Sequence, residues 1–259
     1  MLVRRIPKLD KSRFSGHPDP IPSPLPDMKP ATPLPPGHGR FFLIFGGIYF
    51  VLTLLLGISP RHPADWWMEH LIILFGFSIL FATSRTFVFS KAGYFLAFFF
   101  LCFHGVGAHY TYSEVPYREW WAALTGGTVD GGSRNHFDRA VHFLYGFLLT
   151  RPFREAVYFV LAPRSTFWSH LAVITFIMAS SLFYELFEWA AAEIWGGEAG
   201  MAFLGTQGDI WDAHKDMFLA TVGALLGSLG MILHVRFTGK DPARDWGEER
   251  AKAAAASQG

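Results

Sequence analysis

The chain has 259 residues, of which 51% are hydrophobic and only 17% charged, against roughly a quarter charged in soluble domains. The formal net charge of +1 excludes the broad basic field of a nucleic-acid-binding protein, and the single cysteine, Cys102, excludes both an intrachain disulfide framework and a cysteine-based zinc cluster. With 17% aromatic residues the chain is also unlike a disordered protein, so we expect an all-helical protein embedded in a membrane.

Residues 1–39 are predicted to form a proline-rich, disordered cytoplasmic tail. Ten of the sixteen prolines fall between Pro7 and Pro36, where there are almost no large apolar residues to bury. This composition is typical of an extended or flexible tether. A partner protein with a groove for extended proline segments is the alternative use of such a tail.

Six apolar stretches between residues 40 and 235 predict six membrane-spanning helices, because a hydrocarbon core of about 30 Å needs about 20 mostly apolar residues. The short link Arg85–Lys91 predicts that the second and third helices form an antiparallel hairpin. Residues 236–259 are assigned to a cytoplasmic C-terminal tail. The six stretches are Phe41–Ile58, Trp66–Ala82, Ala92–Tyr110, a segment that starts near His136, Phe167–Trp189 and Trp211–Leu233.

The distribution of Lys and Arg predicts that both termini lie in the cytoplasm. With the N-terminus inside, the cytoplasmic segments hold seventeen of these residues, and the outer segments hold only Arg61, Arg118 and Arg134. Cytoplasmic loops of membrane proteins carry such an excess. We therefore expect an N-in, C-in, multi-pass bundle in contact with the lipid bilayer.

Ionisable side chains gather at the outer ends of five of the six predicted helices. A charged group at the centre of a spanning helix costs at least ~2.5–3.5 kcal/mol, so such groups persist when they are paired, hydrated or functional. Glu185 and Glu188 lie on one face of the fifth helix, and Asp212 and Asp216 on one face of the sixth. No comparable cluster is predicted at the cytoplasmic ends. The other members of the outer layer are Glu69, His70, His104, His109, Asp138, Arg139 and His142.

The fourth helix leaves two alternatives open. Eleven residues separate Arg139 from Arg151, which is about 17 Å of helix and roughly half of the hydrocarbon thickness. Either Asp138 and His142 enter the membrane, or the helix continues past Pro152 and buries the charged residues there instead. We favour the first alternative, with Asp138 and His142 paired one turn apart.

Several of these residues also suit structural roles. Asp209 is expected to cap the N-terminus of the sixth helix, and Lys215 is a candidate partner for a neighbouring acid. His104, alone on an apolar helix, is expected to be a hydrogen-bonded packing residue. Glu185 and Glu188 also suit an interfacial position, with their carboxylates in headgroup water.

The outer layer is predicted to be the site of a metal-dependent hydrolase that acts on a lipid or cell-envelope substrate. Carboxylate and imidazole groups from several helices can hold a divalent ion such as zinc or manganese, and the ion turns a bound water into a nucleophile. The candidate catalytic residues are Glu185 and Asp138, and the candidate metal ligands are His142, Glu188, Asp212 and Asp216.

Two other classes of function use the same residues. A non-catalytic scaffold or accessory subunit would use the cluster as a buried polar network. A cation- or proton-coupled transporter would use the acids as a relay, although the sequence shows no internal repeat of the kind common in transporters. Nucleotide chemistry is not indicated, because the sequence has no phosphate-binding loop.

Three strings resemble one known family, the YjdF-type bacterial inner-membrane proteins, over about residues 40–235. Arg134–Phe143 reads RNHFDRAVHF, Tyr184–Trp189 reads YELFEW, and Gly205–Ala213 reads GTQGDIWDA, which is the most specific of the three. The resemblance implies a multi-pass protein of the bacterial inner (plasma) membrane and implies no particular reaction.

A more distant likeness to VanZ-like membrane proteins rests on an acid–histidine pair that opens one helix and on an Asp-rich start to a later, glycine-containing helix. It implies, by analogy alone, a link to cell-envelope lipids. The residues that carry it are Asp138, His142, Asp212, Asp216, Gly223 and Gly227.

Overall fold

The computed structural model describes residues 38–127, 134–195, 197, 200 and 204–256, and every regular element in these ranges is a helix. Nearly all of the predicted proline-rich tail lies outside the described residues. The six long helices are α1 (His38–Leu56), α2 (Pro63–Thr83), α3 (Lys91–Tyr110), α5 (Phe137–Leu161), α6 (Thr166–Trp195) and α8 (Asp212–Thr238). The short elements are the 3₁₀ turn η2 (Tyr112–Glu114) and the helices α4 (Tyr117–Thr125) and α9 (Pro242–Ala256).

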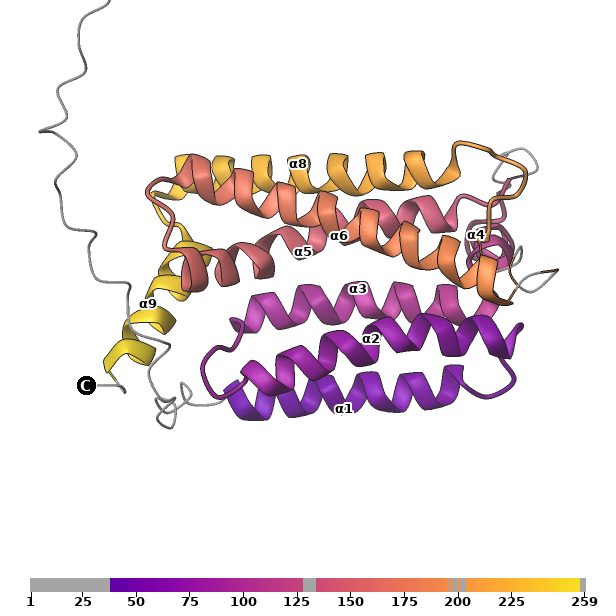
Figure 1. Cartoon of the computed structure of the whole chain (residues 1–259), viewed down its shortest axis with the longest axis horizontal. Coiled ribbons are helices and arrows are strands. Elements are labelled where there is room, and N and C mark those ends of the chain that lie inside the picture. The colour runs from indigo at the N-terminus through magenta and orange to yellow at the C-terminus, as the bar shows by residue number, and fades with distance from the viewer. Residues whose placement is uncertain (1–37, 128–133, 196, 198–199, 201–203, 257–259) are drawn as a thin grey trace, which may run out of the picture.

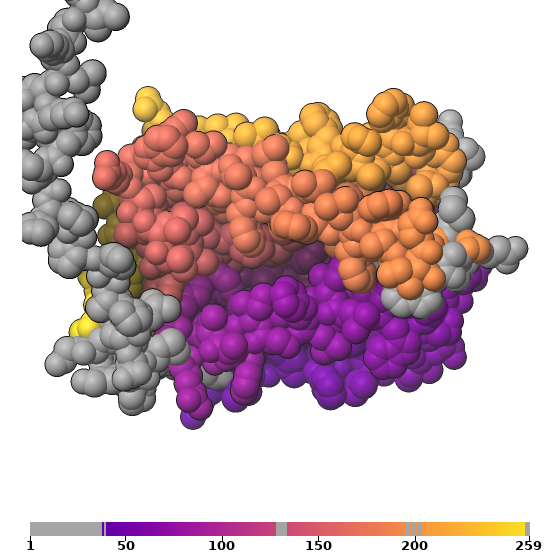
Figure 2. Space-filling view, in the orientation of Figure 1, coloured from indigo at the N-terminus to yellow at the C-terminus, as the bar shows by residue number. Residues whose placement is uncertain are grey.

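The long helices form a bundle with two halves. Helices α1, α2 and α3 lie in one half and α5, α6 and α8 in the other, with α4 and α9 at opposite ends (Figure 1). Helix α3 packs on α5 and joins the halves, and α2 and α3 form the expected antiparallel hairpin. Figure 2 shows a hollow between the halves on one face. Towards the α4 end the halves meet again, where Met68 packs on Phe187 and Ala191.

Four of the helices are long and apolar enough to cross a membrane, namely α2, α3, α8 and the part of α6 over Thr166–Ile194. Helix α1 has a shorter apolar stretch, Arg40–Leu56. Helix α5 carries five charged residues and is not among the four. Large apolar side chains such as Phe75 and Phe183 cover the outside of the bundle. These properties are those of an integral membrane protein.

Helices α5 and α8 pack backbone against backbone. A Cβ atom at Gly146 would collide with the carbonyl of Ala220, and one at Gly223 would collide with the carbonyl of Phe143. Because glycine has no side chain, the two helices can approach this closely. The contact determines how the polar start of α5 faces the polar start of α8.

Helix α5 continues past Pro152, as in the second of the two alternatives that the sequence left open, and it also brings Asp138 and His142 together one turn apart. It runs through Pro152, and Arg154 and Glu155 beyond it have no exposed surface. The carboxylate of Glu155 accepts hydrogen bonds from the backbone N–H and the hydroxyl of Ser90, at 2.9 and 2.6 Å. The prediction that no polar cluster lies at this end of the bundle was therefore wrong.

The segment after α8 folds back as α9 and covers this second cluster. Arg154 donates two hydrogen bonds of 2.6 Å to the carboxylate of Asp241, just before α9 begins. The indole N–H of Trp246 donates to the carbonyl of Val88 at 2.8 Å, so α9 contacts both halves of the bundle. The sequence predicts a tail here and not this helix, because the buried arginine that anchors the helix lies 87 residues before Asp241.

Gly223→Ala should destabilise the protein, because the new Cβ would meet the backbone of α5. We expect the free energy of unfolding to fall by about 1–3 kcal/mol, seen as a lower thermal midpoint in detergent. Gly230→Ala is the matched control on the same helix, since no atom of another described segment lies within 4 Å of the added Cβ there. It should be neutral or stabilising by up to about 1 kcal/mol. Equal effects of the two substitutions would contradict the close packing.

Asp241→Asn should loosen α9, because it leaves the guanidinium of Arg154 buried without its anionic partner. Breaking a buried ion pair in this way costs of the order of 3 kcal/mol. Amide hydrogen exchange of α9 should become faster than in the wild type. The control is Asp245→Asn, which removes an exposed carboxylate from the same helix and should leave exchange unchanged.

The ion pair between Arg154 and Asp241 should weaken in acid. Burial opposes ionisation of Asp241, but the hydrogen bonds and charge of Arg154 outweigh it and lower the pKa of Asp241 below its usual value. A group with a lowered folded-state pKa stabilises the fold above its unfolded pKa of about 3.9 and loses this effect as pH falls through the folded pKa. The protection of the α9 amides, taken relative to their intrinsic exchange rate at each pH, should thus fall in strong acid in the wild type but no further in Asp241→Asn.

Candidate functional site

The polar layer predicted from the sequence lies at the end of the bundle opposite α9. Helices α2, α5 and α8 begin at this end, and α3 and α6 end there (Figure 1). Residues that are far apart in the sequence are thus brought to one level of the bundle. Helix α4 and the connection 204–211 lie across the same end.

Three side chains from α5 and α8 converge closely enough to share one ion. Asp138, His142 and Asp216 each offer a ligand atom, and these atoms lie within 4.8 Å of one another. One helical turn separates Asp138 from His142, and Oδ1 of the first is 3.5 Å from Nε2 of the second. The close contact of α5 with α8 brings Asp216 to them. We call Asp138, His142 and Asp216 the trio.

Two buried carboxylate oxygens in and beside the trio have no hydrogen-bond partner among the described residues. Asp216 is 2% exposed, and its Oδ1 is unpartnered. Glu185 is 9% exposed, and its unpartnered Oε1 lies 3.7 Å from Nε2 of His142. A buried polar atom without a partner is unfavourable, so these oxygens point to a polar ligand or ion that belongs between them.

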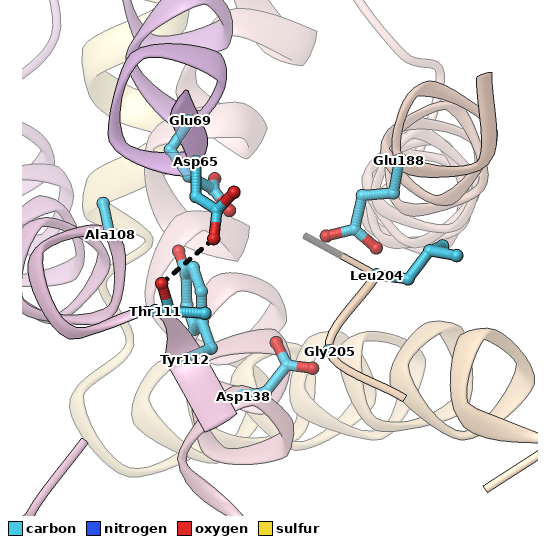
Figure 3. Close-up of a pocket in the computed structure, with 9 residues that line it drawn as sticks. All are labelled: Asp65, Glu69, Ala108, Thr111, Tyr112, Asp138, Glu188, Leu204 and Gly205. Carbon is cyan, nitrogen blue, oxygen red and sulfur yellow. Dashed lines mark hydrogen bonds between the residues drawn. The ribbon is translucent and has the colours of Figure 1, made fainter. Parts of the chain in front are cut away.

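Glu188 does not join the trio but lines an adjoining pocket, into which Asp138 also reaches (Figure 3). Asp138 is therefore shared by the trio and the pocket. The walls come from α2, α3, α5, α6, the segment after α3 and the connection before α8. The polar residues that line the pocket are Asp65, Glu69, Thr111, Tyr112, Asp138 and Glu188.

Two acids of α2 form the far wall of the pocket and are held by hydroxyl groups. The hydroxyl of Thr111 donates to Asp65 at 3.0 Å, the dashed contact in Figure 3. The hydroxyl of Tyr184 donates to Oε2 of Glu69 at 2.8 Å. Asp65 and Glu69 are 3% and 2% exposed, so these carboxylates face the pocket rather than bulk solvent.

His104 lies behind this wall. Its Nδ1 is 2.6 Å from the hydroxyl of Tyr112, and its Nε2 faces Oε2 of Glu69 at 4.0 Å. Burial and the nearby carboxylates of Glu69, Asp138 and Glu188 raise the pKa of Tyr112 well above its usual value, so its hydroxyl stays neutral.

Asp212 faces arginines instead of the trio. Its Oδ1 accepts a hydrogen bond from Arg134 and another, at 3.2 Å, from Arg139. A metal ion at this oxygen would have to displace both guanidinium groups. Oδ1 of Asp212 thus belongs to an ion-pair network that joins α5 to α8, and the role of Asp212 as a metal ligand stays a prediction.

Asp209 belongs to the same network and does not cap α8, whose N-cap residue is Trp211. Its Oδ2 accepts hydrogen bonds of 2.5 Å from Arg139 and Lys215, so the expected pairing of Lys215 with an acid is confirmed. The contact with Lys215, the backbone N–H of Trp211 and the contact with Arg139 lower the pKa of Asp209 below its usual value. Asp209 is thus a carboxylate that anchors the connection 204–211.

Some predicted members of the layer lie outside the site, and some site residues were not predicted. His70 and His109 contact backbone carbonyls through Nδ1, each at 2.6 Å. Three residues of the site were not predicted. Thr111 and Tyr112 lie in the connection after α3, where no pattern in the sequence indicates a site. Tyr184 lies one turn before Glu188 on α6, and this spacing could have indicated that both residues face the site.

The whole site falls within a region that the chain shares with other membrane proteins. Residues 41–236 match the family described as "Predicted membrane protein (DUF2238)". The chain is 35% identical over 190 residues to "Inner membrane protein YjdF" of Escherichia coli (strain K12), which covers 71% of this chain and 86% of that protein. No solved structure matches the chain.

Proposed function

The chain belongs to the DUF2238 family of predicted membrane proteins, and on this premise we propose that it is a metal-dependent hydrolase of the inner membrane. One divalent ion, zinc or manganese, binds between Asp138, His142 and Asp216. The observation that carries the proposal is the buried, unpartnered Oδ1 of Asp216, which lies beside an imidazole and a second carboxylate.

The chemistry of these three groups suits such an ion. Carboxylate and imidazole ligands from facing helices hold metal ions in many bundles, and three protein ligands leave a position open for water. A bound ion would supply a water activated for attack on an acyl or phosphoryl centre. Glu185, whose Oε1 lies 3.7 Å from Nε2 of His142, would take up a proton at this place and return it to the leaving group.

We infer that six helices cross the membrane and that the site opens at its outer face. The start of α1 and the end of α9 both lie at the end of the bundle opposite the site, which agrees with an N-in, C-in arrangement (Figure 1). The excess of Lys and Arg in the segments of that end supports the same orientation. The substrate is then a membrane lipid or a precursor of the cell envelope.

A purely structural role for the trio is less well supported. The cluster under α9 is an example of a structural polar network in this protein, because Arg154 is bonded to Asp241, Ser169 and Tyr158. The trio differs from it in keeping a buried carboxylate oxygen free of any described partner. A scaffold would gain stability by satisfying that oxygen.

Protein purified in detergent and loaded with zinc or manganese should contain close to one ion per chain, measured by mass spectrometry. Asp216→Asn should reduce the metal affinity by at least about tenfold. Loss of a group that only orients a metal ligand already costs about tenfold or more in affinity, and loss of a ligand itself should cost at least as much. Asp65→Asn is the matched control, since it changes a buried carboxylate of the same end that is held by Thr111 and lies outside the trio.

The control should keep the ion, and both variants should elute as folded protein. A wild type that takes up no ion under loading would contradict the proposal. So would an equal loss of metal in both variants while the fold is intact.

A further inference from the structure

We propose that the hollow between α2 and α6 binds one acyl chain of a phospholipid and so places the polar end of that lipid beside the candidate site (Figure 2). The inference deepens the proposed function, because it names the part of a lipid substrate that the protein holds and the side from which the lipid enters. It rests on the proposed function only in taking the bound lipid to be the substrate.

Helices α2 and α6 meet close to the site, at the end of the bundle where α4 lies. The hydroxyl of Tyr184 donates to Glu69 at 2.8 Å, and Met68 packs on Phe187 and Ala191. Figure 2 shows the two halves of the bundle touching at this end. These contacts close the hollow next to the polar site.

Further along α2 the two helices have separated. Gly76 lies two turns after Glu69 on the same side of the helix, because seven residues make almost two full turns. A Cβ atom at Gly76 would meet no atom of another described segment within 4 Å. The side of α2 that contacts α6 at Glu69 therefore faces open space about 10 Å further along the helix.

Aromatic side chains lie at the floor of the hollow. Figure 1 shows α3 and α5, which pack on each other, between α2 and α6. The ring of Tyr145 on α5 lies 5.5 Å from that of Phe100 on α3, and its hydroxyl is 2.6 Å from that of Ser180 on α6. Phe153 of α5 packs in the same way on Phe176 of α6, with the ring centroids 4.9 Å apart. Because the hydroxyl of Tyr145 is already bonded, this floor suits a hydrocarbon chain better than water.

The hollow is continuous with the surface of the protein that faces lipid. Both α2 and α6 are long and apolar enough to cross a membrane. Phe75, the neighbour of Gly76 on α2, and Phe183 on α6 are exposed on the outside of the bundle. Acyl chains that cover these side chains in a bilayer can therefore enter the hollow without crossing a polar layer.

The closed end of the hollow favours a flexible chain over a helix of a second copy or of another protein. A membrane-spanning helix is about 10 Å wide and runs through the whole hydrocarbon core, so it would collide with the contact between Met68 and Phe187. A single acyl chain is narrower and reaches only to the middle of the core. A lipid whose chain fills the hollow has its polar end at the level of Glu69, which lines the pocket in Figure 3.

The test is photolabelling of the full-length protein in detergent, with a phosphatidylethanolamine that carries a diazirine group in one acyl chain. We expect saturable labelling that an excess of the same lipid without the diazirine suppresses. The labelled peptides should come from the stretches of α2 and α6 that border the hollow.

Gly76→Phe should reduce the labelling of these peptides by at least about fivefold, because the phenyl ring would occupy the space of the chain. Gly76→Leu, which fills less of the space, keeps the test informative if Gly76→Phe does not fold. Gly47→Phe is the matched control on α1 and should leave the labelling unchanged. A Cβ atom at Gly47 also meets no atom of another described segment within 4 Å, and Gly47 lies nearly opposite Tyr49, which packs on Phe77 of α2.

Labelling of the hollow peptides that is equal in the wild type and in both Gly76 variants would overturn the inference. So would a wild-type oligomer, measured by native mass spectrometry, that Gly76→Phe dissociates, because a second copy would then fill the hollow. Metal content is measured on the same samples. Metal uptake without lipid labelling in the wild type contradicts this inference alone, and labelling without metal uptake contradicts the proposed metal site alone.

Discussion

The backbone contact between α5 and α8 is the constraint on which the site depends. Asp138 and His142 lie on α5 and Asp216 on α8, so the three groups meet only if these helices approach within the reach of short acidic side chains. Gly146 and Gly223 allow that approach, because neither carries a Cβ between the two backbones. In a membrane, where apolar surface gives little drive for helices to associate, such small-residue packing is the main source of a fixed geometry.

The two ends of the bundle bury charge in different ways. Under α9, Arg154 and Asp241 satisfy each other, and their contact holds a helix across both halves. At the opposite end, Asp216 and Glu185 keep buried oxygens without described partners. Near Arg154 and Asp241, the unpartnered buried atoms among the described residues are the two nitrogens of His170, whereas in the trio and Glu185 they are carboxylate oxygens. Carboxylate oxygens suit a bound cation, and this favours a metal site over a scaffold.

The sequence predicted what depends on local periodicity and missed what depends on contacts between distant segments. The third helix was predicted over Ala92–Tyr110 and is observed over Lys91–Tyr110, because apolar length and a clear break determine both ends. The one-turn spacing of Asp138 and His142 could likewise be predicted, and the contact between their side chains is present. Both features depend on residues within a single helix.

The roles of Asp209 and Asp212, by contrast, could not be predicted from the local spacing of residues. Asp209 and Asp212 look like residues that favour a helix start, but Arg139, from a segment 70 and 73 residues away, pairs with both. Helix α9 was missed for the same reason. Its sequence is polar and rich in alanine, and its position depends on Arg154.

An X-ray absorption spectrum of the zinc-loaded protein would show whether Asp138, His142 and Asp216 bind one metal ion. We expect a first shell of oxygen and nitrogen atoms at about 2.0–2.2 Å from the zinc ion, with outer-shell scattering from one imidazole that disappears in His142→Ala. A sulfur shell, or an imidazole signal that survives His142→Ala, would contradict it.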